Sequence, residues 1–433
     1  MVEMDALSKY FKFEERGTNF RTEILAGLTT FLSMAYIVIV APSAFMEGGM
    51  NFGGVYIATV IATVTGTLIM GAVANYPIAI SCGLGIMAYL VYTLILGQGI
   101  PWQEALGAAA ISSGIFIVLS LTTFREMFIN SIPESLKRSI AAGIGLFIAL
   151  IGFRNGHFVT GSESTMVTMG SLSDPVLILT LLGMAVTMVL MVVRVHGAIF
   201  IGMVFTAVIA YVRGYWALPE TFFSMPHGFS ETFLQLRIGD LGVLAPAIFT
   251  LLLVTLFDTT GTMLGIGRQA GLIKDGQFPN LKSALMADAV ASFTGAFCGT
   301  SPTSAYVESG TGVSVGGRTG FTSVVTAALF GLMLFFQPLA AAISSIPAVT
   351  APALILTGCF MLASVADIDW QDYSEAFPAF LTMVLMPFTY SITNGVGIGM
   401  ITYVLLKIFA GRIKEIHPLL IVMAVLFAVQ MIM

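Results

Sequence analysis

Long apolar stretches follow one another along almost the whole chain, separated by short groups of charged, proline and glycine residues. A helix needs about 20 apolar residues to cross the hydrocarbon of a bilayer, so each stretch predicts one membrane span. Fourteen spans are predicted, near residues 22–45, 54–74, 78–97, 103–123, 135–153, 174–193, 197–212, 242–267, 281–298, 303–314, 317–337, 349–366, 374–391 and 394–411. A last apolar run, Leu419 to Met433, is shorter, and we expect it to be interfacial or part of a bent final helix.

The composition agrees with a membrane protein and excludes other classes. Hydrophobic residues make up 57% of the 433 residues and charged residues only 9%, whereas soluble domains carry about 25% charged residues. So few charges cannot cover a soluble surface, which excludes a cytosolic enzyme, a disordered chain and a nucleic-acid binder with its basic patch. The three scattered cysteines, Cys82, Cys298 and Cys359, indicate neither a disulfide framework nor a metal site. The expected fold class is an all-α polytopic membrane protein.

The positions of the basic residues orient the predicted spans. With the N-terminus in the cytoplasm, 15 of the 18 Lys and Arg residues fall on the inner side, and only Arg154, Arg213 and Arg237 fall outside. Cytoplasmic loops are enriched in Lys and Arg, so this asymmetry supports the fourteen-span topology. Residues 1–21 mix acids and bases and contain no apolar run, so no cleavable signal peptide is expected. We expect a multi-pass protein of the cell (inner) membrane.

Weak internal matches indicate a duplication of seven spans. The sequence Ser-Ile-Pro occurs at 131–133, before the fifth span, and again at 345–347, before the twelfth. His-Gly at 196–197 in the seventh span likewise resembles Asn-Gly at 394–395 in the fourteenth. A repeat with an odd number of spans is inverted in the membrane, as in many secondary transporters. The expected architecture is therefore 7+7 inverted repeats.

The third span of each predicted half is broken. Span three starts at Pro77 and contains Gly83 and Gly85, and span ten reads TSPTSAYVESGTG over 300–312, too short and polar to cross alone. Backbone that leaves helical geometry at membrane depth must line a cavity or be buried in protein. Broken spans at corresponding positions point to a binding site, where helix N-termini offer unpaired N–H donors.

Two acidic residues lie where lipid would be expected. Asp258 is the one charge between residues 241 and 267, and Glu308 lies in the broken tenth span. A lone carboxylate at that depth costs several kcal/mol unless it is partnered or protonated. Thr262 and Gly265 share the helical face of Asp258. We expect both acids to carry protons in transport, the alternatives being a structural acid for Asp258 and a helix cap for Glu308.

Other polar residues are expected to be structural. Asp288 lies six residues from Lys282 and should be an interfacial acid near the cytoplasmic boundary. The four histidines map to connections or span ends, which disfavours a histidine proton relay. A solvated loop is expected for the acidic cluster Asp367, Asp369, Asp372 and Glu375.

Motifs over nearly the whole chain are specific in combination. They are FDTTGT at 257–262, ALMADA at 284–289, GTS at 299–301, VESG at 307–310, GGRTG at 316–320, TEILAGLTTFLSMAY at 22–36, and the segment 143–152. With these motifs the chain resembles the AzgA-like purine permeases, a branch of the nucleobase–cation symporters related to the bacterial uracil permease.

The resemblance implies proton-coupled uptake of adenine, guanine or hypoxanthine by alternating access. The proton gradient would supply the energy, with no cofactor and no metal. A core domain would comprise spans 1–4 (1–128) and 8–11 (240–337), and a gate domain spans 5–7 (129–239) and 12–14 (338–433). The resemblance also implies pairing as a homodimer.

Site residues are carried over by position. Asp258 and Glu308 would accept hydrogen bonds from the N–H edge of the base, and Thr262 occupies the second polar position on span eight. Phe257 or an aromatic residue of span one would cover the ring face. Backbone groups near Leu84, Gly85, Tyr306 and Val307 would complete the edge contacts.

Two positions depart from the family pattern, and three other functions are less compatible with the sequence. Met87 and Ala41 replace asparagines, and losing a buried amide removes two donors and an acceptor, which leaves the preferred base open. An anion transporter or channel of the same fold is disfavoured because no Lys or Arg lies near the two midplane acids. A membrane enzyme would need a motif such as HExxH or GxSxG, which the chain lacks. A non-transporting scaffold would not need two buried acids.

Overall fold

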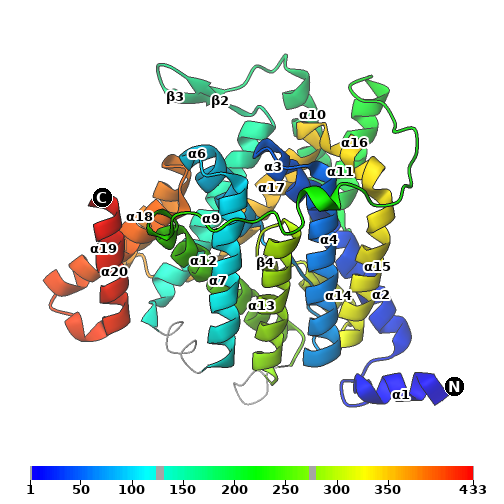
Figure 1. The fold of residues 1–433 in the computed structure, drawn as a ribbon, viewed down its shortest axis with the longest axis horizontal. Helices are drawn as coiled ribbons and strands as arrows, with labels where there is room; N and C mark the ends of the chain where they lie inside the picture. Colours follow the sequence, from blue (N-terminus) through cyan, green and yellow to red (C-terminus); the bar gives the residue numbers. More distant parts are fainter. Residues whose placement is uncertain (1, 123–130, 273–278, 433) are drawn as a thin grey trace.

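The computed structural model of the protein describes residues 2–122, 131–272 and 279–432. Most of these residues are helical, and two short two-stranded sheets complete the fold (Figure 1). Arg125 and Lys274, two of the bases assigned to the inner side, lie outside the described residues. The predicted helical, polytopic class is confirmed.

The elements follow the predicted spans closely. The first half contains α1 (Val2–Tyr10), α2 (Phe20–Met34), α3 (Ile37–Glu47), α4 (Phe52–Ile69) with a π-helical end (Met70–Ala74), β1 (Ile80–Cys82), α5 (Leu84–Ala88), a π-helical turn (Tyr89–Ile95), α6 (Leu96–Gln98), α7 (Trp102–Leu121), α9 (Glu134–Asn155), β2 (Val159–Ser162), β3 (Met166–Met169), α10 (Pro175–Val192) and α11 (Ala198–Val212). The second half contains α12 (Leu241–Gln269), α13 (Leu281–Cys298), β4 (Thr303–Ala305), α14 (Ser309–Val315), α15 (Gly320–Met333), α16 (Gln337–Ser344), α17 (Pro347–Met361), α18 (Tyr373–Phe388), α19 (Ile392–Phe409) and α20 (Pro418–Ile432). Short 3₁₀ turns lie at Phe229–Glu231, Leu334–Phe336, Leu362–Asp367 and Ile413–Glu415.

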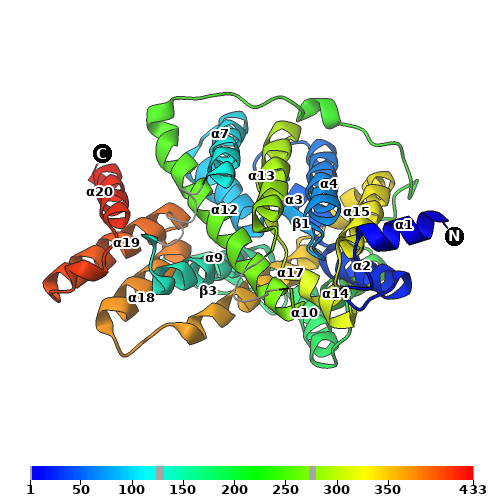
Figure 2. The same ribbon diagram turned by 90° about the horizontal axis from the view of Figure 1, so that it is seen from below.

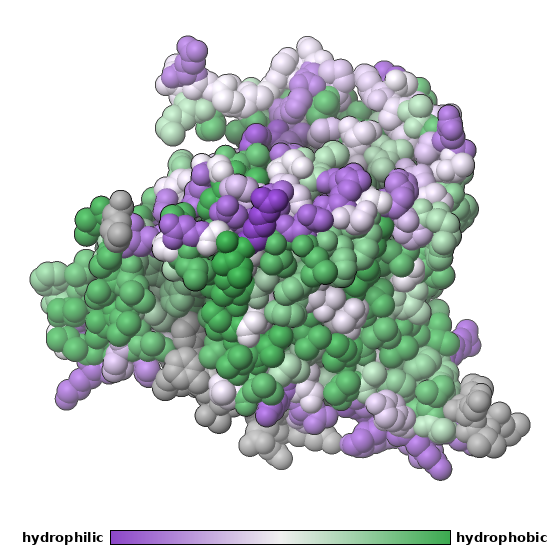
Figure 3. Space-filling view, viewed as in Figure 1, coloured by the Kyte–Doolittle hydropathy of each residue, from purple (hydrophilic) through white to green (hydrophobic). Residues whose placement is uncertain are grey.

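The chain is a multi-pass membrane protein. Nine helical segments within the described ranges are long and apolar enough to cross a membrane, and three further apolar helices, Leu84–Gln98, Ala198–Val212 and Pro418–Ile432, are shorter. Figure 3 shows a broad apolar band across one face of the molecule between polar rims, as a bilayer requires. Spans were also predicted at α13, α14 and α18, which belong to neither set, so the count of fourteen crossings stays a prediction.

The helices pack in two groups, seen on opposite sides in Figure 2. In one group α13 packs against α4 and α7, α15 packs against α2 and α4, and α12 packs against α7. In the other group α9 packs against α17 and α18, α18 packs against α19, and α10 packs against α11 and α17. Backbones approach closely within the first group: a Cβ at Gly320 would lie 1.9 Å from the carbonyl oxygen of Gly71, the kind of contact that small residues permit between membrane helices.

Two strands meet in the interior, packed against α4, α12 and α13 of the first group. β1 pairs antiparallel with β4, with Ile80 opposite Ala305 and Cys82 opposite Thr303. Every residue of both strands is buried. The strands are therefore the extended parts of the broken spans three and ten, where non-helical backbone is covered by protein rather than by lipid.

Hydroxyl groups of neighbouring helices surround these strands. Thr67 of α4 bonds both the amide and the carbonyl of Ile80, each at 3.0 Å. Thr63 lies 2.6 Å from the Ser81 hydroxyl, and the Ser292 hydroxyl accepts a 2.9 Å bond from the Thr303 amide. Buried backbone groups need such partners, so the threonine and serine content of α4 and α13 supports the strand crossing.

Part of the acidic cluster was interpreted wrongly as a solvated loop. Lys407 of α19 is fully buried, and its Nζ lies 2.6 Å from Glu375 and 2.9 Å from Glu415. Arg412 lies 2.5 Å from Asp372, and its guanidinium holds the pKa of that carboxyl well below its usual range. Lys407 and Arg412 thus neutralise acids at the start of α18, far from them in sequence, and spacing along the chain does not reveal this pairing. The remaining members are more exposed: Asp367 pairs with Arg138 at 3.2 Å, and Asp369 accepts bonds from nearby backbone amides.

The last apolar run forms a helix of its own, so the expectation of a bent final helix is wrong for it. α19 ends at Phe409, the chain turns through Gly411 in the left-handed region (φ 73°), and α20 begins at Pro418. α20 packs beside α19 (Figure 1), and its Phe427 is buried against Phe249 of α12.

Candidate functional site

A central cavity of about 110 Å³ lies where the strand crossing meets α12 and α17. The residues that line it are Tyr36, Leu84, Gly85, Asp258, Ser304, Ala305, Tyr306, Val307, Glu308, Thr357, Phe360 and Met361. Six of the eight residues assigned to the site from the sequence are among them. No Lys or Arg is part of this lining, so the two carboxylates set its charge.

Asp258 reaches the cavity from the middle of α12. Its side chain is half-buried and hydrogen-bonds the Ser304 hydroxyl of β4. The helix begins at Leu241, where Asp240 caps it by accepting from the Gly242 amide at 2.8 Å. A continuous helix of 29 residues thus carries the carboxylate to the strand crossing.

Glu308 lies just before α14, directly after the extended part of span ten. Its Oε1 accepts a hydrogen bond from the Tyr36 hydroxyl at 2.6 Å. Glu308 and Asp258 are close enough to interact electrostatically. An acid from a continuous helix and an acid from a broken span therefore share one small cavity.

Leu84, Gly85, Tyr306 and Val307 frame the cavity from the two broken spans. Leu84 and Gly85 form the first turn of α5, and the Gly83 before them provides no side-chain cap for the amide donors at this helix start. The Tyr306 hydroxyl donates to the carbonyl of Cys82 at 2.6 Å, and Val307 is 64% exposed. Tyr306 thus ties β4 to the end of β1, whereas Val307 projects into open space.

Phe257 and Thr262 lie in an adjoining cavity rather than in the central one. This inner vestibule of about 700 Å³ shares Asp258, Val307 and Met361 with the central cavity and extends to Glu134 and Gln269. Glu134 is the first residue of α9 and Gln269 the last of α12, and these helix ends lie at the same end of the molecule as α1 (Figure 1).

Asp288 is a fully buried structural acid, deeper in the protein than the interfacial position expected. Thr259 of α12 donates to one carboxylate oxygen at 2.6 Å, and Thr303 of β4 donates to the other at 2.8 Å. The carboxylate joins α12, α13 and β4 next to the site and does not line the central cavity.

Tyr36, Ser304 and Thr357 line the cavity but were not singled out from the sequence. Tyr36 ends the motif at 22–36, so a signal was present, although nothing in the spacing tells which way its hydroxyl points. Met87, which replaces the family asparagine, is buried in the apolar core and does not line the cavity; Ala41 is also buried.

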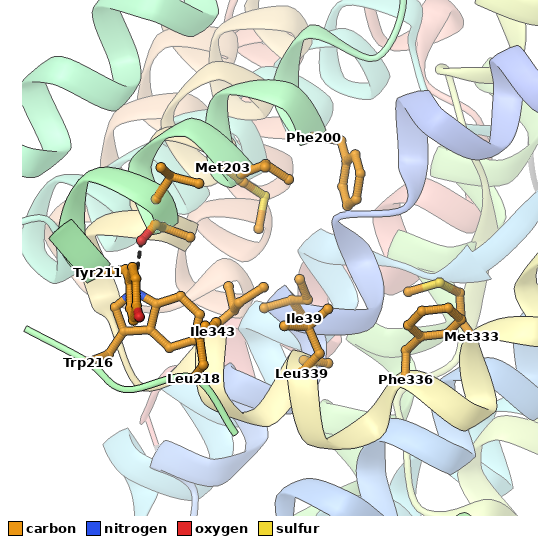
Figure 4. Close-up of a pocket in the computed structure, with 14 residues that line it drawn as sticks. Ile39, Phe200, Met203, Tyr211, Trp216, Leu218, Met333, Phe336, Leu339 and Ile343 are labelled. Carbon is orange, nitrogen blue, oxygen red and sulfur yellow. Dashed lines mark hydrogen bonds between the residues drawn. The ribbon is translucent and has the colours of Figure 1, made fainter. Parts of the chain in front are cut away.

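Other cavities have a different character. A fully apolar cavity of about 350 Å³ lies between α3, α11 and α16, with Phe200, Ile39 and Leu339 on its walls and Trp216 at one end (Figure 4). Trp216 donates to the carbonyl of Ala207 at 2.7 Å. On the side opposite α1, a polar cavity of about 350 Å³ contains Glu47 and Arg154. Neither brings two carboxylates to a strand crossing, and no group of three metal-ligating side chains occurs in the described ranges.

Comparisons with known proteins agree with this architecture. A model of the permease family matches residues 21–398. The chain is 46% identical over 429 residues to the guanine/hypoxanthine permease PbuO of Bacillus subtilis (strain 168), covering 97% of this chain and 99% of the relative. It is 38% identical to the adenine permease AdeP of Escherichia coli (strain K12), covering 98% and 96%.

A solved structure shares the fold at low identity. The transmembrane domain of the cyanobacterium bicarbonate transporter BicA superposes with a TM-score of 0.65 at 13% identity, covering 87% of this chain and 97% of that domain. The family match and the relatives confirm the resemblance drawn from the motifs, and the chain belongs to the permease family that includes the purine permeases.

Proposed function

We propose that this protein takes up purine nucleobases together with protons by alternating access. The observation that carries the proposal is the pair Asp258 and Glu308, which face one small cavity at the crossing of two broken spans. The purine permeases among the relatives support the substrate class.

The chemistry of the cavity suits a purine. Guanine and hypoxanthine present ring N–H donors beside a carbonyl oxygen, and adenine presents an amino group beside ring nitrogens. The carboxylates of Asp258 and Glu308 would accept from the N–H groups, and amides at the start of α5, near Leu84 and Gly85, would donate to the acceptors. Phe360 or Tyr36 would cover the ring in the central cavity, and Phe257 and Thr262 would contact the base in the inner vestibule.

The same two acids would carry the proton. A carboxylate in a membrane interior is costly when it is ionised and unpartnered. One of the two acids can lower that cost by binding a proton while the other accepts an N–H of the base. Proton and base would therefore enter the cavity together, with the proton gradient as energy source and no cofactor.

Alternating access would move the core domain (1–128 and 240–337) against the gate domain (129–239 and 338–433), arranged as inverted repeats. Contacts between these parts close the side opposite α1: Thr250 lies 3.1 Å from the Thr393 hydroxyl, and Asn155 donates to Glu47 at 3.1 Å. The open vestibule lies on the side of α1. With the N-terminus in the cytoplasm of a cell-membrane protein, this arrangement corresponds to an inward-facing state, and a homodimer would leave the cavity within each copy.

Uptake by cells deficient in purine transport tests the proposal. Cells expressing the protein should accumulate labelled guanine, and a panel of unlabelled adenine, hypoxanthine, xanthine and uracil should compete in an order that gives the preferred base. Asp258→Asn and Glu308→Gln should each abolish pH-dependent uptake. Wild-type rates in both variants would refute the site, and labelled bicarbonate uptake without any purine uptake would support the anion alternative.

A further inference from the structure

Tyr36 occupies the break in the first span. α2 ends at Met34 and α3 begins at Ile37, so Tyr36 lies between two helical segments. The side chain of Tyr36 is fully buried, yet its hydroxyl reaches the central cavity. Because packing holds the ring in place, the hydroxyl is the one polar group that this side chain presents to the cavity, and its position is fixed.

That hydroxyl contacts both parts of the molecule. It donates to Glu308 Oε1 at 2.6 Å, and it lies 3.5 Å from the hydroxyl of Thr357 on α17. A phenol has a single proton to donate, so with Glu308 as acceptor the longer contact is one in which Thr357 donates. Glu308 follows β4, whereas α17 packs against α9 in the second helix group.

The bond fixes the role of each carboxylate oxygen. Among the side chains that the structure describes, Tyr36 is the one that donates to the Glu308 carboxylate, and it does so at Oε1. When Glu308 is ionised, Oε2 is left to accept an N–H group. When Glu308 is protonated, Oε1 still accepts from Tyr36, so the proton belongs on Oε2, where it can be donated to a carbonyl or ring nitrogen.

We propose that Tyr36 is a positioning residue that holds Glu308 for the base and, through Thr357, links its state to the α9–α17 helix group. This inference rests on the proposed purine transport. Losing the Tyr36 bond releases the carboxylate and weakens binding of the base. Losing Thr357 leaves Glu308 held but removes the link to α17, so it slows turnover rather than binding.

Three variants separate these effects, assayed for labelled guanine uptake and for equilibrium guanine binding to purified protein. Tyr36→Phe should weaken binding and raise KM on the order of tenfold, as expected for a lost bond to a charged group. Thr357→Val should lower the maximal rate severalfold and leave binding within about twofold. Tyr56→Phe is the matched control, because Tyr56 is equally buried and its hydroxyl donates to the carbonyl of Met333, away from the cavity; it should leave both quantities near wild type.

The outcomes distinguish this proposal from the one on which it rests. If wild-type protein neither binds nor takes up a purine, the proposed function fails. If wild type is active and Tyr36→Phe matches Tyr56→Phe in binding and KM, the role of Tyr36 is refuted. Should Tyr36→Phe fail to give folded protein, Thr357→Val decides: an unchanged maximal rate refutes the link between Tyr36 and α17.

Discussion

Glu23 and Asp288 are fully buried and surrounded by donors, whereas Asp258 and Glu308 face a cavity with few partners. Five donor groups around the start of α15, from Arg318, Thr319 and Thr322, point at the Glu23 carboxylate. In the part of the chain that the structure describes, the Glu308 carboxylate receives one side-chain bond, from Tyr36. A carboxylate whose oxygens are all engaged stabilises the fold and cannot exchange partners, while one with a free oxygen at a cavity can take up a proton or a ligand.

The largest expected effect is on guanine uptake: replacing either acid of the central cavity should impair transport without lowering the stability of the protein. Asp258→Asn and Glu308→Gln should each lower guanine uptake roughly hundredfold, since a bond to a charged group contributes about 1.5–3 kcal/mol. Their melting temperatures in detergent should equal or exceed that of wild type, because each change removes a charge that is costly to bury. A melting temperature several degrees lower would place these acids with Asp288, among the structural carboxylates.

The opposite result is expected at Asp288. Asp288→Ala should reduce the free energy of unfolding by about 3 kcal/mol, because the hydroxyls of Thr259 and Thr303 lose their acceptor. Guanine affinity, measured on the fraction that elutes as folded protein, should stay within about twofold of wild type. If Asp288→Ala kept wild-type stability but lost guanine binding, Asp288 would belong to the binding site. It would then not differ from Asp258 and Glu308.

The smallest effect concerns an acid that is held by an ion pair outside the membrane. Arg412 lowers the pKa of Asp372, so the pair stabilises the fold above the ordinary Asp pKa of about 3.9 and loses this contribution as pH falls through the lowered value. Melting curves should show Asp372→Asn below wild type at pH 7, with the gap narrowing below about pH 4. A gap that stays constant with pH would assign the difference to packing.

The sequence alone could place the two acids of the site and the broken spans, because a lone charge or a Gly- and Pro-rich break in an apolar run is visible in one dimension. It could not show that Tyr36 points at Glu308, since that depends on how the first span turns at its break. Nor could it pair Lys407 with Glu375, because the partners lie on different helices. Phe257 and Thr262 share the helix of Asp258, yet they line the vestibule alone. Phe257 points to another side of the helix, and Thr262 lies on the face of Asp258 but one turn further along.

The pairing of β1 with β4 has a consequence for how the chain is made. β1 is synthesised early, but its backbone partners at Thr303–Ala305 leave the ribosome only after all of α7 to α13. Until then the amide of Gly83 and the carbonyl of Ala79 would lack the partners that Pro302 and Tyr306 provide, at a depth where hydrocarbon does not tolerate unpaired backbone. The third span therefore cannot reach its final position as it is inserted, and assembly of the site is a late step of biogenesis that joins the two halves of the chain.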